Sequence, residues 1–229
     1  MFLTILLVLL GMIPSLAWLI FYLHEDMEHP EPKILIFYTF IAGAVVTLLV
    51  LGFQFAAHSW LRAQGIATYS FTSFLFLAGI EEIFKFLAVY LTVSRRKEFD
   101  EPVDAMVYMI VAALGFATVE NIGSIFQANA APYLSPGPIE TTVLRFVGAT
   151  LLHTLTSGVV GFYWGKALAK HGSYAGLIVK GLLLATLLHT IFNYLIIKSE
   201  PLALPLVFLL FVGMFVLSDF EKLKHSKQI

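Results

Sequence analysis

The sequence contains no cysteine, so neither a disulfide framework nor a thiolate site is available to this chain. Charged residues are scarce too, because Asp, Glu, Lys and Arg together make up 13% of the 229 residues. Their signs nearly cancel, since the formal net charge is -1, and no basic cluster with interleaved aromatic residues is present. We therefore expect no nucleic-acid partner.

Apolar residues predominate in the chain. They make up 59% of the chain, and the mean hydropathy is +0.87, which is far too apolar for a soluble domain of this length. Continuous apolar runs of about 20 residues recur from end to end, the length needed to cross ~30 Å of hydrocarbon. An outer-membrane barrel would instead show alternating segments of ~10 residues. The composition therefore predicts an all-α polytopic protein that forms one integral domain, residues 1–229, in a lipid bilayer.

The apolar runs predict about seven transmembrane helices, separated by polar or proline-rich segments. The predicted helices span roughly residues 2–23, 34–57, 68–93, 105–127, 142–166, 175–197 and 202–220. The first run is long enough to cross and lacks both a basic leader and an A-x-A-like cleavage site, so we expect a retained helix rather than a signal peptide.

Cations in the predicted loops gather mainly on one side of the membrane. That side collects Lys33, Arg95, Arg96, Lys97, Lys166, Lys170, Lys180, Lys222, Lys224 and Lys227. The other side collects Arg62, Arg145 and Lys198. Because cations accumulate on the cytoplasmic side, we expect the N-terminus outside and the C-terminus in the cytoplasm of a multi-pass protein of the cell membrane.

The hexapeptide ATLLHT occurs twice, at 149–154 and 185–190, and puts a histidine inside two predicted helices. Ionisable residues inside a span cost roughly 2.5–3.5 kcal/mol each at mid-helix, and they usually face the bundle interior or a wet cavity. Besides Lys85, the ionisable residues inside the predicted helices are Glu81, Glu82, Glu120, His153 and His189. A single histidine of this kind more often packs than binds a ligand, but two in matched polar stripes favour a functional role.

The helix predicted at 68–93 carries two adjacent glutamates, Glu81 and Glu82, and Lys85 can reach either of them on one helix face. One interpretation is a neutralised ion pair that holds helices together. However, one lysine neutralises only one glutamate, and the two side chains point ~100° apart. The other carboxylate still needs a partner, a proton or a metal.

Counting residues from the helix ends places Glu81, Glu120, His153 and His189 within ~10 Å of one another along the membrane normal, at ~1.5 Å per residue. We therefore expect an active site in the bundle of the third to sixth helices, in the outer half of the bilayer.

This set of residues is typical of water activation. Two neutral imidazoles and a carboxylate make a common three-ligand zinc site with an open position for water. Glu120, His153 and His189 are the candidate zinc ligands, and Glu81 or Glu82 is the candidate general base. Without a metal, the glutamates and histidines could activate water by themselves, and the residues do not decide between these alternatives.

Other motifs restrict the chemistry. Asn193, one turn beyond His189, could donate a hydrogen bond to a developing oxyanion. The chain has neither an H-E-x-x-H motif nor a G-x-S-x-G motif, so the usual zinc-protease helix is excluded and serine chemistry at Ser157 is disfavoured.

Six motifs occur in order along the chain. They are DMEHPEPK (26–33), EEIFK (81–85), FDEPVDAMVY (99–108), FATVEN (116–121), HTLTSGVVGFYWGKA (153–167) and HTIFN (189–193). Together they resemble the PrsW intramembrane proteases, which are related to the CAAX-processing and bacteriocin-processing endopeptidases. PrsW proteins favour an aspartate four residues after the final histidine, whereas this chain has Asn193, as the CAAX-type relatives do.

The resemblance implies hydrolysis of peptide bonds within or near the membrane. It implies catalytic roles for Glu81 and Glu82, with Lys85 completing their E-E-x-x-K motif. The other residues it places in the active site are Glu120, His153, His189, Asn121 and Ser157. It also implies a membrane-anchored protein substrate, and some family members make the first cut in a membrane-anchored anti-sigma factor.

Two other classes of function fit buried polar residues. Intramembrane Glu, His and Lys residues also mark ion pathways, so a proton- or ion-coupled transporter is the alternative, although the chain shows no repeat of half-chain length. A scaffold or sensor would use the same residues only to hold helices together, and its function would survive Glu81→Gln.

Overall fold

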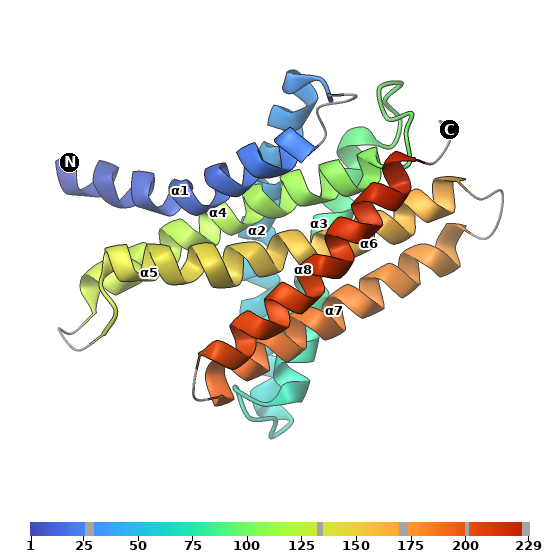
Figure 1. The fold of residues 1–229 in the computed structure, drawn as a ribbon. Helices are drawn as coiled ribbons and strands as arrows, with labels where there is room; N and C mark the ends of the chain where they lie inside the picture. The colour runs from blue at the N-terminus through green and yellow to red at the C-terminus, as the bar shows by residue number, and fades with distance from the viewer. Residues whose placement is uncertain (26–29, 132–134, 170–173, 200–201, 226–229) are drawn as a thin grey trace.

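The computed structural model describes residues 1–25, 30–131, 135–169, 174–199 and 202–225, and the regular structure in these ranges is all helical (Figure 1). The elements are α1 (Phe2–Glu25), α2 (Lys33–Ala63), α3 (Phe71–Val93), α4 (Asp104–Ala130), α5 (Pro138–Arg145), the π-helical segment η1 (Phe146–Thr150), α6 (Leu151–Ala169), α7 (Tyr174–Lys198) and α8 (Ala203–Lys224). Parts of the predicted loops, including the first half of the DMEHPEPK motif, lie outside the described residues.

The seven predicted helices correspond to seven long helices in the described ranges, because α5, η1 and α6 follow one another without a break. Six of them are long and apolar enough to cross a membrane. The exception is α3, which carries Glu81, Glu82 and Lys85 in its middle. The expected all-α, polytopic fold is therefore confirmed.

Helix α4 lies at the centre and contacts α1, α2, α3 and α6 (Figure 1). Every residue from 104 to 118 is buried, as expected of a helix that is apolar on all sides. The outer helices instead expose large apolar side chains such as Leu48, Leu91, Leu210 and Met214. Surfaces of this kind suit contact with lipid rather than water.

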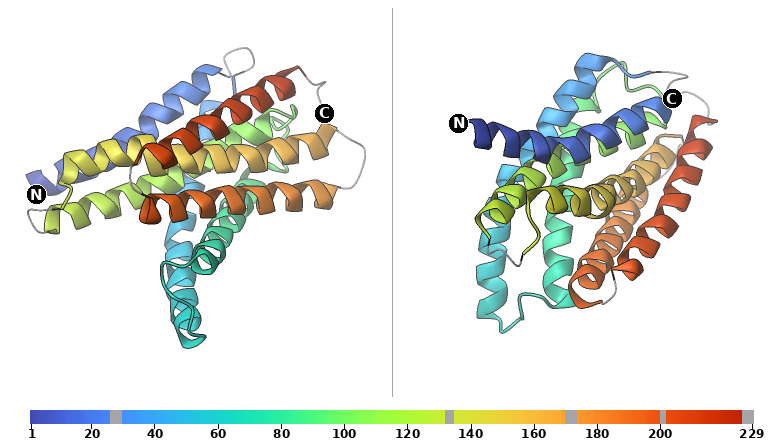
Figure 2. Two further views of the ribbon diagram at one scale, coloured as in Figure 1. Left: turned by 60° about the horizontal axis from the view of Figure 1, so that its bottom comes forward. Right: turned by 60° about the vertical axis from the view of Figure 1, so that its left-hand side comes forward.

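Helices α2 and α3 form a hairpin that crosses the other helices, and its joining end projects beyond them (Figure 2). Two glycines permit the crossing of α2 and α4. A Cβ at Gly43 would lie 1.9 Å from the carbonyl oxygen of Ala112, and one at Gly115 would lie 1.9 Å from that of Phe40. The two backbones therefore touch, and no side chain fits between them.

The glycines of α6 also mark close contacts. A Cβ at Gly161 would lie 2.5 Å from the Cα of Met106, and one at Gly165 would lie 2.3 Å from the carbonyl oxygen of Pro102. Helix α6 thus packs its glycine-rich half directly on the start of α4.

The helix predicted at 142–166 differs from the structure in two ways. In the structure this helix begins earlier, at Pro138, where proline suits the first helical position. It also contains the π-helical segment, which ends just before His153. The indole of Trp18 donates a hydrogen bond of 2.9 Å to the carbonyl oxygen of Phe146 at the start of this segment. Short π segments within α-helices often occur at functional sites.

Candidate active site

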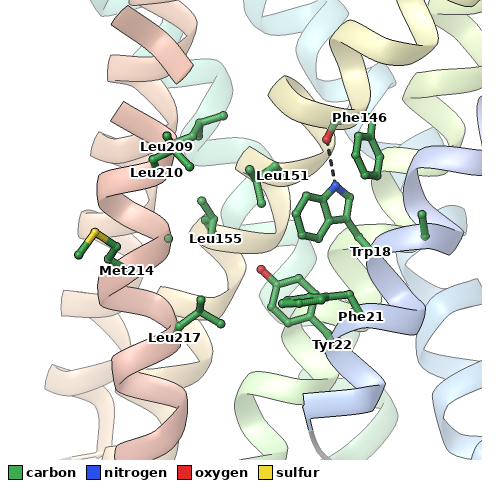
Figure 3. A pocket seen from close by; sticks show the side chains of 12 residues that line it. Trp18, Phe21, Tyr22, Phe146, Leu151, Leu155, Leu209, Leu210, Met214 and Leu217 are labelled. Atoms are coloured by element: carbon green, nitrogen blue, oxygen red, sulfur yellow. Dashed lines mark hydrogen bonds between the residues drawn. The ribbon is translucent and has the colours of Figure 1, made fainter. Parts of the chain in front are cut away.

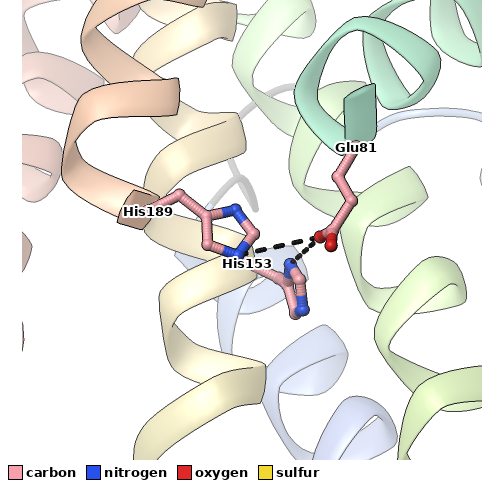
Figure 4. A group of neighbouring side chains, drawn as sticks. All are labelled: Glu81, His153 and His189. Carbon is pink, nitrogen blue, oxygen red and sulfur yellow. Dashed lines mark ion pairs between the residues drawn. The ribbon is translucent and has the colours of Figure 1, made fainter. Parts of the chain in front are cut away.

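Three buried side chains from three helices converge at the centre of the bundle (Figure 4). They are Glu81 of α3, His153 of α6 and His189 of α7, and one ligand atom from each lies within 4.8 Å of the other two. Glu81 Oε2 is 4.0 Å from His153 Nδ1 and 3.7 Å from His189 Nε2. The structure therefore brings together the two ATLLHT histidines, as the matched stripes predicted.

The neighbouring carboxylate, Glu82, has a different environment. Its Oε1 accepts hydrogen bonds from Lys85 Nζ at 2.6 Å and Thr156 Oγ1 at 3.1 Å, and it lies 2.8 Å from His189 Nδ1. Glu82 and Lys85 are both fully buried. Lys85 thus pairs with Glu82, and Glu81 is the carboxylate that needs another partner.

Glu120 contacts His153 on the side away from Glu81. Its Oε2 lies 2.9 Å from His153 Nε2 and accepts a hydrogen bond of 3.1 Å from Arg145 Nη2. The buried group with metal-ligand spacing therefore contains Glu81, whereas the sequence suggested Glu120 with the same two histidines.

The outer carboxylates set the tautomers of both histidines. An ionised carboxylate only accepts hydrogen bonds, so Glu120 places the proton of His153 on Nε2 and Glu82 places that of His189 on Nδ1. The remaining nitrogens, with their lone pairs, are the two that face Glu81. Pairing of each histidine with an outer carboxylate is typical of metal-binding histidines.

Gln54 of α2 was not predicted from the sequence. Its Nε2 donates a hydrogen bond of 2.7 Å to Glu81 Oε1. The other oxygen, Oε2, is buried without a hydrogen-bond partner in the described part of the chain, and it faces the histidines. Gln54 therefore fixes the orientation of the Glu81 carboxylate. An uncharged amide in an apolar run is a weaker signal than a charge, so the sequence did not indicate a role for Gln54.

Arg145 was assigned only to a loop cation set, yet it joins the site. It bonds Glu120, and its Nε also donates to Asn121 Oδ1. Asn121 in turn donates a hydrogen bond of 3.0 Å to Thr150 Oγ1. Asn121 thus links α4 to the π-helical segment and supports Arg145.

The last two predicted residues lie at the edge of this cluster. Ser157, one turn after His153, is fully buried, and its hydroxyl has no hydrogen-bond partner among the residues described. Asn193, one turn after His189, lines a pocket together with Arg145.

The central group suits a cation. Three acceptor atoms, on Glu81, His153 and His189, face one another, and one carboxylate with two imidazoles is a common zinc ligand set. The cluster also has more carboxylates than cations. Lys85 Nζ lies 3.3 Å from His153 Nδ1, so the lysine and a metal ion would share that lone pair. The residues present therefore fit zinc, on the condition that Lys85 gives up this contact.

A pocket of about 490 Å³ between α1, α6 and α8 is not part of this site (Figure 3). Leu151 and Leu155 line it, two residues before and after His153, so it lies against the opposite face of α6. Its walls are apolar and aromatic, and the hydroxyl of Tyr22 is engaged by Thr154.

Comparison with known proteins gives a consistent result. Residues 31–218 match the family described as PrsW family intramembrane metalloprotease. The chain is 31% identical to the protease PrsW of Geobacillus kaustophilus over 83% of this chain and 79% of that protein. It is 32% identical to that of Oceanobacillus iheyensis over 81% and 80% of the two chains.

A further relative, the protease PrsW of Bacillus subtilis, is 27% identical over 93% of both chains. No solved structure matches the chain. The comparisons give no support to the transporter alternative. The chain belongs to the PrsW family of intramembrane proteases.

Proposed function

We propose that this peptidase hydrolyses peptide bonds of membrane-associated proteins, with water activated at Glu81, His153 and His189. The observation that supports the proposal is the convergence of their three acceptor atoms in a buried centre. Glu81 Oε2 has no hydrogen-bond partner in the described part of the chain, and His153 Nδ1 has a contact of 3.3 Å with Lys85 Nζ. A water molecule or a cation at this centre would satisfy the buried carboxylate oxygen, which is costly to leave unpaired.

Glu81 is the general base in this proposal. Each glutamate has one carboxylate oxygen without a hydrogen-bond partner in the described chain, but that of Glu81 faces both histidines, at 4.0 and 3.7 Å. Glu82 is instead held through its Oε1 by Lys85, Thr156 and His189. Water attacks the carbonyl carbon of the substrate and passes a proton to Glu81. The same carboxyl group then gives that proton to the amine as the carbon–nitrogen bond breaks.

The neighbouring residues orient this centre. We assign Glu120 and Glu82 to holding His153 and His189 in the required tautomers, in place of the ligand role expected of Glu120. Lys85 balances the charge of Glu82. Asn193 is proposed to donate a hydrogen bond to the oxyanion, since it lies one turn beyond His189 on the pocket side.

Zinc is the metal that this donor set suits, and Glu81, His153 and His189 would hold it. A zinc ion there would supply Lewis-acid activation of the water and the carbonyl group. Glu82, Glu120, Lys85 and Asn193 would keep the roles given above with metal bound, whereas Glu81 would then serve as a ligand instead of the general base.

The substrate class follows from the location of the site inside a bundle of apolar helices. A membrane-anchored protein can present its peptide bond there. The first cut of a membrane-anchored anti-sigma factor, as in other members of the family, is the specific substrate role that we propose.

The test measures metal content and cleavage together in detergent-purified wild type, Glu81→Gln and His189→Ala. Bound zinc is measured by mass spectrometry, and cleavage is measured with a library of transmembrane peptides. We expect the wild type to cleave and both folded variants to be inactive. Zinc at one equivalent that is lost in His189→Ala would support the metal site.

Cleavage by metal-free wild type would keep the protease and remove zinc from the mechanism. Cleavage by Glu81→Gln at the wild-type rate would contradict the proposed base.

A further inference from the structure

A second pocket, here called the Arg145 pocket, lies between the π-helical segment and the helices α7 and α8. Its lining residues are Leu144, Arg145, Val147, Gly148, Ala149, Phe192, Asn193, Ile196, Leu202 and Leu206. Its volume is about 360 Å³, within the usual range for ligand pockets. Eight of these ten residues are apolar or glycine, so the walls suit an apolar group.

The two polar lining residues connect this pocket to the active site. Arg145 bonds Glu120 at 3.1 Å, and Glu120 lies 2.9 Å from His153. Asn193 lies on α7 one turn beyond His189. Two connections therefore join the pocket to the group of Glu81, His153 and His189: one runs from Arg145 through Glu120 to His153, and the other runs along α7 from Asn193 to His189.

The exposed fractions of the side chains indicate that the active site is most accessible on the side of Glu120 and Arg145. The side chains of Glu120 and Arg145 are 24% and 18% exposed, whereas those of His153 and His189 are 3% exposed. A group that reaches the histidines from outside the bundle can therefore enter past Glu120 and Arg145, and Arg145 lines the pocket.

We propose that the Arg145 pocket is the subsite that holds a large apolar side chain of the substrate next to the bond that is cut. A charged or amide side chain would lose its hydration against these walls and is disfavoured. Gly148 and Ala149 offer little side-chain bulk in the wall formed by the π-helical segment, which lets a peptide backbone approach. Arg145 uses two of its five N–H groups on Glu120 and Asn121, and further N–H groups can donate to a peptide carbonyl.

This inference rests on the proposed function and deepens it, since it names the substrate side chain that the enzyme selects. The first experiment uses synthetic transmembrane peptides in which the residues flanking the mapped cut are varied one at a time. The wild type should cleave peptides with Leu or Phe at one flanking position at least ~10-fold faster than those with Ala there, as expected for a well-filled apolar pocket.

Ala149→Phe fills the pocket and should abolish or reverse this preference, so that peptides with Ala or Gly become the better substrates. Val143→Phe is the matched control, because Val143 is exposed on the neighbouring turn and does not line the pocket. It should retain the wild-type preference. Wild-type preference in a folded Ala149→Phe protein would overturn the inference.

A second experiment needs no turnover and uses the absence of cysteine from the chain. Ile196→Cys, in the pocket, is combined with Glu81→Gln, and the double variant is mixed with peptides that carry a single cysteine at successive positions. Oxidation should link Cys only to the peptide position that flanks the cut made by wild type. Ile197→Cys, one residue on and outside the pocket lining, is the control.

Equal linking by the 196 and 197 variants, or linking only at peptide positions far from the cut, would overturn the subsite. The proposed function fails in a different way. If no peptide is cleaved in a manner that depends on Glu81, the protease mechanism is overturned, and the inference with it.

Discussion

At the residue scale, two adjacent glutamates have opposite tasks. Glu82 neutralises a fully buried lysine, and Glu81 faces the histidines. Removing the charge of Glu82 leaves Lys85 buried without its carboxylate, and breaking a buried pair in this way costs about 3–5 kcal/mol. We therefore expect Glu82→Gln to unfold at a clearly lower temperature than wild type.

Glu81→Gln is the matched variant, since the amide oxygen can still accept the hydrogen bond from Gln54. It should unfold close to the wild-type temperature and yet not cleave peptides. Thermal unfolding in detergent, followed by tryptophan fluorescence, separates the two. Equal loss of stability in both variants would contradict this division of roles.

Gln54 provides a second prediction at this scale. Gln54→Leu removes the donor that fixes Glu81 Oε1, so the carboxylate can turn away from the histidines. Loss of an outer partner of this kind typically costs ~10–100-fold in activity. We expect such a fall in kcat for a transmembrane peptide with little change in thermal unfolding.

The control for Gln54 is Gln64→Leu, because Gln64 is exposed where α2 ends and makes no contact with the site. This variant should keep the wild-type kcat. A folded Gln54→Leu protein with wild-type kcat would show that Glu81 is held by other contacts.

The sequence indicated most residues of the cluster, because charges inside apolar helices are conspicuous. It did not indicate which carboxylate joins the two histidines. Counting residues gives depth along a helix, but the rotation of each helix decides whether Glu81 or Glu120 faces the pair. Gln54 and Arg145 were missed because an amide and a cation near a helix end are both ordinary in membrane proteins.

At the element scale, the crossing of α2 and α4 depends on direct contact between the backbones of the two helices at glycine positions. Gly43→Ala would put a Cβ 1.9 Å from the carbonyl oxygen of Ala112, so the helices must separate. Overpacking of this kind typically costs about 1–3 kcal/mol, and here the obstacle is backbone that cannot rotate away. We expect a lower unfolding temperature and, since α2 carries Gln54, reduced cleavage.

Gly52→Ala is the control on the same helix, because nothing lies within 4 Å of a Cβ there. It should be neutral or slightly stabilising, as alanine favours the helix. An unchanged unfolding temperature in Gly43→Ala would contradict backbone contact at the crossing.

The π-helical segment shows why some elements cannot be read from sequence. Residues 146–150 continue the apolar pattern of their helix, and one extra residue in a turn leaves no mark in composition. The segment is held by partners distant in the chain, the indole of Trp18 and the amide of Asn121. Such contacts exist only once the helices have packed.

At the scale of the whole molecule, the lengths of the apolar runs predicted seven helices, with ends that differ from the structure by up to six residues, as at Ala63 of α2. Run length does not predict the steep crossing of the α2–α3 hairpin (Figure 2), because the crossing depends on contacts between helices, such as that of Gly43 with α4. Helix α3 is itself too polar to qualify as a span by composition, and one of its faces packs against α2, α4 and α7. Glu81, Glu82 and Lys85 lie on this buried face, whereas the opposite face exposes apolar side chains such as Leu91. Placement on the buried face explains how the helix tolerates three charges.

The orientation of the molecule in the membrane is the remaining prediction, with the N-terminus outside and the cation-rich ends in the cytoplasm. Because the chain lacks cysteine, single cysteines report on each side without background. Gln64→Cys and Lys97→Cys both fall at exposed positions, at opposite ends of α3. In intact cells, a membrane-impermeant maleimide should label the first and not the second, and a permeant maleimide should label both. Labelling of Lys97→Cys alone by the impermeant maleimide would show that the molecule has the opposite orientation in the membrane. Because Arg145 lies on the same side as Gln64 in this topology, that result would also move the open side of the active site from the outer to the cytoplasmic half of the bilayer.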